Sequence, residues 1–301
     1  MRGATQTTGR LLRVPLTLAV VWAILFVGVP FAMSLYGPYV VRPGIQCIKA
    51  TTKLINANGP FPADMCQGLA QLYRVTFAQL FVDSMFRSLA LLVGAAVLAL
   101  VLGTLLGMSA ALLRRRAWAG AAILGVTTLL SAVPAFFIAY FLQILVVIVG
   151  ATPDGANLLP VFGFGYDKHL ILPLLSISAP AIAFTAQFTA SRMQEVLDSD
   201  FITVANAKGL RTSWILTVHV LPHVRPVLLE GLGSGLRVSV ASLPIIEFLF
   251  NWRGIGQLAL EAVGVHDAAG FIFSALVLAA LFATLSAIAD LSRPRAIYQG
   301  V

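Results

Sequence analysis

The chain has 301 residues, of which 59% are hydrophobic and 11% are charged, and its mean hydropathy is +0.92. Soluble domains average roughly 45–50% apolar and about 25% charged residues, so this composition excludes an ordinary soluble protein. The net charge of +8 suggests no nucleic-acid partner, because the lysines and arginines lie mostly between apolar runs, as they do in membrane proteins.

The apolar runs predict an all-α integral membrane protein, since each helical span needs about 20 apolar residues and the chain has room for about six. The first run, Val14–Tyr36, follows three arginines and no acid. A cleaved signal peptide is the alternative, but this run exceeds the usual ~7–15-residue apolar region of such peptides. We therefore interpret residues 1–84 as a retained span with a cytoplasmic N-terminus and a long extracytoplasmic loop, and 85–301 as a core of five further spans.

The predicted outer loop, Gly37–Asp83, contains the only two cysteines, Cys47 and Cys66. Two extracytoplasmic cysteines in one loop can form a disulfide, which would contribute about 3 kcal/mol in the chain-entropy interpretation. Two unpaired thiols remain the alternative.

The second and third spans are expected at Met85–Leu113 and Trp118–Gly150, separated by three consecutive arginines that favour a cytoplasmic loop. Pro134 interrupts the third span. A proline inside a span frees a backbone carbonyl, which is tolerated where neighbouring helices or pore water can satisfy it, so Pro134 is a candidate pore position.

A compact polar stretch, Asp200–Pro222, lies between the fourth span (Leu170–Thr189) and the fifth (Pro226–Phe250). Asp198, Ser199 or Asp200 can cap a short helix there, and Gly209 lies where a helix end needs a residue with positive φ. A second short helix, Leu210–Leu221, is expected to end at Pro222.

The same stretch resembles the cytoplasmic coupling loop of ABC importer permeases, in particular those of peptide and nickel importers. The resemblance rests on Ala205-x-Ala207-Lys208-Gly209-Leu210 and on the spacing from Gly209 to Leu221-Pro222, while Thr203 and Val204 replace the Glu-Ala of the general family pattern. It implies that loop 198–224 contacts an ATPase through Asp200, Thr203, Ala205, Ala207, Lys208, Gly209, Leu210, His219, Leu221 and Pro222.

The fifth span contains glycines 231, 233 and 235, whose spacing permits close helix approach. It also contains two charged residues two helical turns apart, Glu230 and Arg237. Arg237 either faces the pore or pairs with Glu230, and the alternative is that its side chain extends to a membrane interface. Before the sixth span (Phe271–Ala289), a further stretch resembles the family's outer turn, except that Arg253 replaces the usual proline. The implied gate residues are Glu247, Phe250, Gly254, Gly256 and Asp267.

The resemblance implies a type I ABC importer permease in a bacterial cytoplasmic membrane, with both termini in the cytoplasm. Twelve of the 20 lysines and arginines fall on predicted inner segments and seven on outer ones, which agrees with this orientation. The expected partners are a second homologous permease, in a heterodimer, two ATPase subunits and an extracytoplasmic binding protein that delivers peptides or similar small solutes.

No G-x-x-x-x-G-K-[ST] phosphate loop occurs, so ATP and Mg are expected on the partner ATPases, and no catalytic, metal or cofactor site is expected on this chain. The alternative function is a secondary transporter or channel without ATPase partners. Such a protein would need ion-coupling carboxylates or an inverted repeat, whereas the acids here cluster at span ends and in loops. A polytopic membrane enzyme is a third class, disfavoured because no nucleophile or metal-ligand pattern is present.

Overall fold

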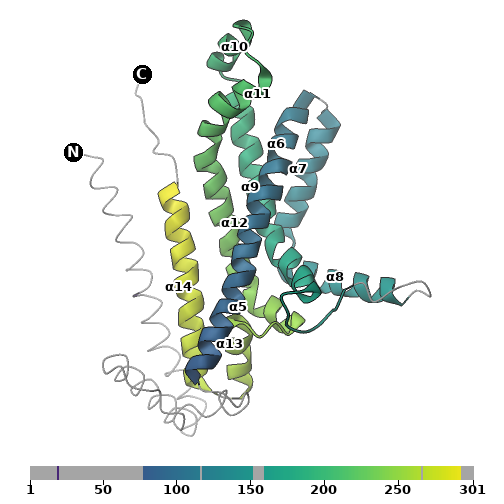
Figure 1. The fold of residues 1–301 in the computed structure, drawn as a ribbon, viewed down its shortest axis with the longest axis vertical. Helices are drawn as coiled ribbons and strands as arrows, with labels where there is room; N and C mark the ends of the chain where they lie inside the picture. The colour runs from purple at the N-terminus through teal and green to yellow at the C-terminus, as the bar shows by residue number, and fades with distance from the viewer. Residues whose placement is uncertain (1–18, 20–76, 116, 152–158, 266, 293–301) are drawn as a thin grey trace. The chain divides into compact units, whose positions relative to one another are not determined.

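The computed structural model describes residues 77–115, 117–151, 159–265 and 267–292, together with Ala19 (Figure 1). Within these residues every regular element is helical. The predicted first span and both cysteines, Cys47 and Cys66, lie outside the described residues, so the 1–84 and 85–301 division and the disulfide stay predictions.

The elements follow one another along the chain as mostly long helices with two π-helical insertions, η2 and η5. They are α5 (Phe77–Leu98), η2 (Ala99–Gly103), α6 (Thr104–Leu112), η3 (Leu113–Arg115), α7 (Ala117–Ala132), α8 (Ala135–Gly150), η4 (Lys168–Leu170), α9 (Ile171–Leu197), α10 (Asp200–Ala207), α11 (Thr212–Trp214), η5 (Ile215–Val220), α12 (Leu221–Phe250), α13 (Ile255–Gly264) and α14 (Ala268–Ser292).

Four helical runs in the described part are long and apolar enough to cross a membrane: 79–112, 168–197, 212–250 and 270–287. A fifth is present if α7 and α8 together form one span. The all-helical membrane architecture predicted from composition is thus confirmed, while the count of six includes a first span outside the described residues. Helix α5 begins at Phe77, eight residues before the predicted start at Met85, so Asp83 lies in a helix and not in a loop.

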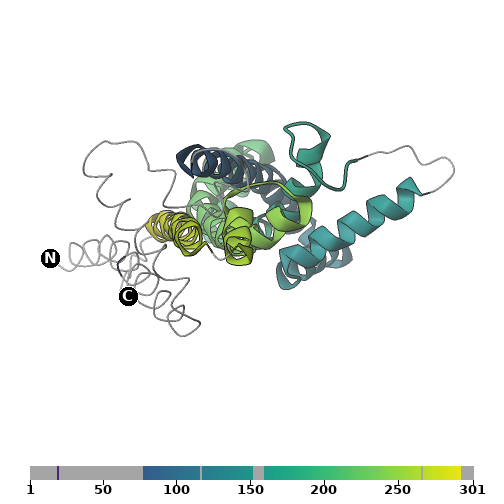
Figure 2. The same cartoon turned by 90° about the horizontal axis from the view of Figure 1, so that it is seen from below.

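The interruption at Pro134 is confirmed, and it divides the predicted third span into two helices. The chain bends by 103° at this break. Helices α7 and α8 have 16 residues each, which is about 24 Å at 1.5 Å per residue and less than the ~30 Å hydrocarbon core. Figure 2 shows α8 along its whole length, straight and unbroken.

The prediction that a helix ends at Pro222 is wrong, because the helical run continues from Thr212 to Phe250. The π-helical segment η5 ends at Val220, two residues before Pro222, and the N–H of Leu221 donates to the carbonyl of Leu216, five residues back. A proline in an α-helix clashes with the carbonyl four residues before it. The wider π-helical turn changes which carbonyls face the following residues, so the proline is accommodated without a break.

The chain forms two compact units whose boundaries fall inside helices α5, α8, α9, α12 and α14. Apart from Ala19, the described residues of the first unit are 77–91, 139–151, 159–174, 240–265 and 267–284; those of the second unit are 92–115, 117–138, 175–239 and 285–292. The first unit contains the described segments that the sequence places outside, and the second contains the basic loop and the coupling stretch.

Close helix contacts organise the second unit, in which α6 and α7 lie side by side (Figure 1). A Cβ atom at Gly107 of α6 would lie 2.5 Å from the carbonyl oxygen of Ala186 in α9. A Cβ at Gly231 of α12 would lie 2.8 Å from the Cβ of Phe188, which also belongs to α9. The close approach expected at the glycines of the fifth predicted span is therefore confirmed.

Candidate functional site

Helix α10 forms the first half of the coupling stretch and begins after Ser199, whose backbone is extended (φ −76°, ψ 150°). Of the three residues predicted as caps, Ser199 takes the cap position. Its hydroxyl donates to the carbonyl of Val196 and accepts no hydrogen bond from the N–H groups of α10, while its own carbonyl accepts from Ile202 and Thr203. Asp200 lies in the first turn, where a carboxylate is favoured by the helix dipole.

The end of α10 confirms the prediction for Gly209, which has a φ of +72°. The N–H of Gly209 donates to the carbonyl of Asn206 (2.9 Å) and that of Leu210 to Ala205 (3.3 Å). These two bonds form a Schellman motif, in which a left-handed residue closes the helix. A Cβ atom at Gly209 would meet no atom within 4 Å, so only the backbone conformation favours glycine here.

One face of the coupling stretch is buried in its own unit. Ile202 and Ala205 of α10, together with Ile215 and Val220 of η5, pack in one apolar cluster. The other members of this cluster come from α6, α9 and the first turns of α12: Ala111, Met193, Val196, Val224 and Leu228. Burial of this kind contributes on the order of 1.5–3 kcal/mol per large aliphatic side chain, so α10 is held firmly against the helices on both sides of it.

The opposite face of the stretch is apolar and exposed. Phe201 and Val204 are 44% and 51% exposed, and Trp214 is 57% exposed. Thr203, Ala207, Lys208 and Leu210, which the family resemblance places in an ATPase contact, are exposed as well. Of the other predicted contact residues, Ala205 is buried with Ile202, and His219 and Leu221 are half-buried.

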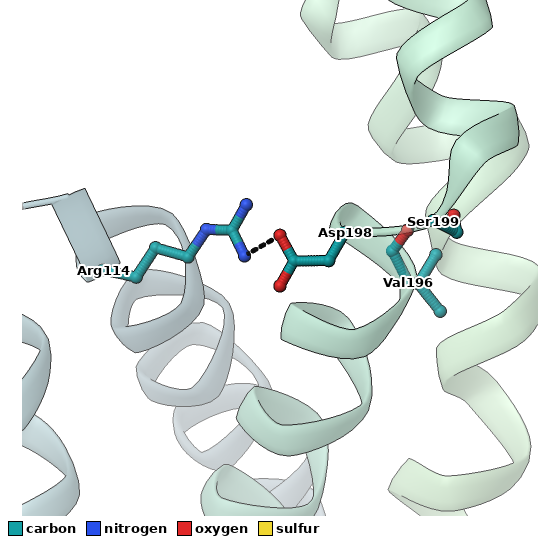
Figure 3. A network of polar contacts seen from close by, with 4 residues as sticks. All are labelled: Arg114, Val196, Asp198 and Ser199. Atoms are coloured by element: carbon teal, nitrogen blue, oxygen red, sulfur yellow. Dashed lines mark hydrogen bonds and ion pairs between the residues drawn. The ribbon is translucent and has the colours of Figure 1, made fainter.

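An ion pair joins the basic loop after α6 to the start of the coupling stretch (Figure 3). The Arg114 guanidinium lies 2.6 Å from the Asp198 carboxylate, and the two side chains are 34% and 66% exposed. Arg114 belongs to η3, and Asp198 separates α9 from α10. The pair therefore ties α10 to α6, in addition to its covalent link to α9.

Further polar contacts surround the C-terminal half of the stretch. The Nδ1 of His223 donates to the carbonyl of His219 (2.8 Å), and the His223 ring lies 5.4 Å from the Phe201 ring. Leu221 and Pro222 lie in the first turn of α12, where Leu221 is half-buried and Pro222 is exposed.

In the first unit, Glu247 is the centre of a buried hydrogen-bond network. Its side chain is fully buried and accepts from the Ser88 hydroxyl and from the backbone N–H groups of Gly256 (2.7 Å) and Gln257 (3.0 Å). Ser88 in turn accepts from the N–H of Ile255 (2.8 Å). The carboxylate thus joins α12 to the start of α13 and, through Ser88, to α5.

This network explains the two glycines that the sequence analysis placed in the outer turn. A Cβ atom at Gly254 would collide with the Glu247 carboxyl group, and one at Gly256 would lie 2.6 Å from the Cα of Pro244. Phe250 is buried, and its carbonyl accepts from the N–H of Gly163 (2.8 Å).

Arg253 has a φ of +58°, a conformation that proline, with φ fixed near −65°, cannot adopt. Its N–H donates to the side-chain oxygen of Gln257 (2.6 Å), and the neighbouring Trp252 is fully buried, with its indole N–H donating to the carbonyl of Arg87 (3.1 Å). The turn at Arg253 is therefore held on both sides without a proline.

Asp267 precedes α14 and caps it, because its carboxylate accepts from the N–H of Gly270 (2.9 Å) and its carbonyl accepts from Phe271. At the start of α9, Asp167 accepts from both the ring Nδ1 (2.7 Å) and the backbone N–H (3.2 Å) of His169. These hydrogen bonds lower the pKa of the exposed Asp167 carboxyl below its ordinary value.

The two charges of the fifth predicted span are both half-buried in α12. Arg237 donates to the hydroxyl of Ser234 (2.9 Å), one turn earlier. The pairing of Arg237 with Glu230 and the pore role of both residues stay predictions, as does that of Pro134.

Sequence reasoning missed several residues that complete these sites. Ser88 is a small polar residue within an apolar run, with no local signal that it bonds to a carboxylate 159 residues away. The partner of Arg114 is 84 residues away, although three consecutive arginines did mark the loop. Helix α13 was not predicted. Its ten residues lie between the predicted outer turn and Asp267, and the sequence analysis assigned no element there.

The sequence resembles known transport proteins along most of its length. Residues 103–298 match the family described as binding-protein-dependent transport system inner membrane component. A putative peptide permease of Brucella ovis is 28% identical over 230 residues, which are 74% of this chain and 70% of the relative.

Two further relatives carry names for other solutes. The glutathione transport system permease protein GsiC of Shigella flexneri is 28% identical over 201 residues, 66% of this chain and 63% of the relative. The metal-staphylopine import system permease protein CntB of Staphylococcus aureus is 28% identical over 204 residues, 68% of this chain and 63% of the relative.

Proposed function

Because the chain belongs to the family of binding-protein-dependent transport system inner membrane components, we propose that it couples ATP hydrolysis on separate subunits to solute import through the coupling stretch 198–224. In this proposal, a second homologous permease forms the other half of the substrate path, in a heterodimer. Two ATPase subunits bind ATP and Mg, and an extracytoplasmic binding protein delivers the solute.

The observation that carries the proposal is the two-sided character of the coupling stretch. One face is buried against α6, α9 and α12, while the exposed face carries Phe201, Val204 and Trp214. Exposed apolar side chains on a surface helix mark interaction sites. A partner that binds the exposed face and changes its own conformation would therefore move the coupling stretch together with α9 and α12, as in rigid-body conformational switching.

The orientation in the membrane follows from the same assignment. With the coupling stretch in the cytoplasm, Arg114 and the two arginines after it also lie inside, as the positive-inside rule expects. The turn around Glu247–Gly256 then belongs to the outer side, and both termini lie in the cytoplasm.

The solute is proposed to be a small peptide or a peptide-like compound. The relatives are named for peptides, for glutathione and for a metal complex of staphylopine, which are all small polar solutes.

The direct test is to purify the full chain from its native membrane in mild detergent and to identify the accompanying proteins by mass spectrometry. Co-purification of a second permease and of ATPase chains is the expected result. A chain that arrives alone or as a homo-oligomer would refute the proposal and favour a transporter or channel without ATPase partners.

A matched pair of substitutions tests the docking face itself. Phe201→Ser removes an exposed aromatic ring from the coupling stretch, and Phe162→Ser removes one that is 67% exposed in the first unit. We expect the first variant to lose the ATPase subunits and the second to keep them. Equal retention in both variants would show that the ATPases bind elsewhere.

A further inference from the structure

A cavity of about 180 Å³ opens in the first unit where the beginning of α5 faces the turn before α13. Its lining combines apolar side chains with three charged ones, Asp83, Arg87 and Arg253. The charged residues of α5 belong to the first turns of a helical run that extends from 79 to 112. This run is longer than the ~20 residues that a span needs, so its first turns can lie outside the hydrocarbon.

Arg87 is held in place by contacts on several sides. Its guanidinium carbon lies 4.3 Å from the centroid of the Phe164 ring, and its Nη1 lies 3.5 Å from the carbonyl oxygen of Arg253. Its own carbonyl accepts from the Trp252 indole. A planar guanidinium stacked on an aromatic ring keeps free N–H groups for bidentate binding of a carboxylate.

Arg253 contributes the second positive charge, from a backbone fixed by Gln257. Its side chain is exposed and makes no hydrogen bond or ion pair with any described residue. The positive φ of Arg253 belongs to the region that non-glycine residues seldom adopt, and the buried turn around it maintains this conformation.

Asp83 provides the opposite charge in the same lining. It lies one helical turn before Arg87 on α5, on the same face. No ion pair joins Asp83 to any described residue, Arg87 included. The cavity therefore presents two guanidinium groups and one carboxylate that are not neutralised by one another through direct contact.

We propose that this cavity binds a small zwitterionic solute, whose carboxylate contacts Arg87 and Arg253 and whose ammonium contacts Asp83. Ligand pockets for drug-sized molecules have volumes of roughly 300–1,000 Å³, so a smaller cavity suits a solute of about the size of a dipeptide and not an oligopeptide. The inference rests on the proposed import function, because it places a recognition site for peptide ends on the permease itself.

The test measures binding of dialanine to the purified full-length complex, by calorimetry or saturation-transfer NMR, in three variants. Arg253→Gln and Asp83→Asn each remove one charge from the cavity. Lys168→Gln removes an exposed positive charge from the same unit without touching the lining and is the matched control. We expect Arg253→Gln to weaken binding at least about tenfold, because it removes a hydrogen bond between charged groups, and Lys168→Gln to have no effect.

Two modified probes assign the charges. Asp83→Asn should weaken binding of dialanine but not of N-acetyl-dialanine, which lacks the ammonium group. Arg253→Gln should weaken binding of dialanine but not of dialanine amide, which lacks the carboxylate. Equal binding by all variants, or an equal loss with Lys168→Gln, would overturn the proposal.

A partner's carboxylate is the competing occupant. If Arg253→Gln left dialanine binding intact but reduced co-purification of the extracytoplasmic binding protein, the cavity would be a docking site for that protein, and the proposal would be wrong. The test does not depend on ATP hydrolysis. If the chain co-purified with no ATPase but bound dialanine in the charge-dependent way described, the proposed function would be refuted and the cavity would still be a binding site for the zwitterion.

Discussion

Replacing Gly209 by valine perturbs the coupling stretch at its tip without creating a clash. The residue has a φ of +72°, and a Cβ atom there would meet no atom within 4 Å. The effect of the substitution is therefore a backbone effect. Asparagine, which occupies the left-handed region more readily than other non-glycine residues, provides the matched control.

The free-energy cost of Gly209→Val follows from the geometry of the turn. An L-residue in the left-handed region costs roughly 1–2 kcal/mol, and a β-branched residue lies at the upper end or beyond. If the turn relaxes instead, it loses the bonds from Gly209 to Asn206 and from Leu210 to Ala205, at about 1 kcal/mol each. Either way, the ratio of native to relaxed turn falls by a factor of about 5–30.

The assay is solute uptake per ATP hydrolysed, in vesicles reconstituted with the complete complex. Gly209→Val should lower this ratio, by up to roughly 30-fold if the turn controls coupling, while Gly209→Asn should stay within about twofold of the natural protein. The amount of protein in the membrane should be unchanged in both. Full uptake by Gly209→Val, or equal loss in both variants, would refute the coupling role of this turn.

Two further predictions concern the helices behind the coupling stretch. Reversing the charge with Asp198→Arg should reduce coupled uptake modestly, because exposed ion pairs contribute about 0.2–1 kcal/mol. Adding Arg114→Asp should restore uptake. A double variant with no more uptake than the single variant would show that the ion pair does not support coupling. Gly107→Val should lower the midpoint temperature of thermal unfolding of the purified protein, because overpacking against Ala186 costs typically about 1–3 kcal/mol. Gly125→Val is the control and should leave the midpoint unchanged, because a Cβ atom there would meet no atom within 4 Å. Equal midpoints for the two variants would contradict the close contact of α6 with α9.

The features that sequence reasoning predicted correctly are local ones. The positive φ of Gly209 follows from a helix that ends there, and the interruption at Pro134 follows from the chemistry of proline. The rule that proline ends a helix gave a wrong prediction where a π-helical turn offered an alternative. Pro222 was expected to end a helix, but the π-helical segment η5 in front of it lets the helix continue.

Element boundaries were less well predicted because polar residues do not by themselves end a membrane helix. Asp83 was assigned to the outer loop, whereas α5 begins at Phe77 and carries this carboxylate in its second turn. A helix that projects beyond the hydrocarbon can expose such a residue to water, and the apolar pattern does not report how far the helix extends.

The sequence alone determined the membrane class, the helical content and the family of this protein, because hydrophobicity, turn chemistry and short motifs are properties of neighbouring residues. Tertiary structure decided which distant groups meet. Ser88 and Glu247 are 159 residues apart and Arg114 and Asp198 are 84 apart, and neither pair could be chosen from the chain. Folding brings such groups together only because helices pack on apolar faces over long separations, and the polar contacts form where that packing places them.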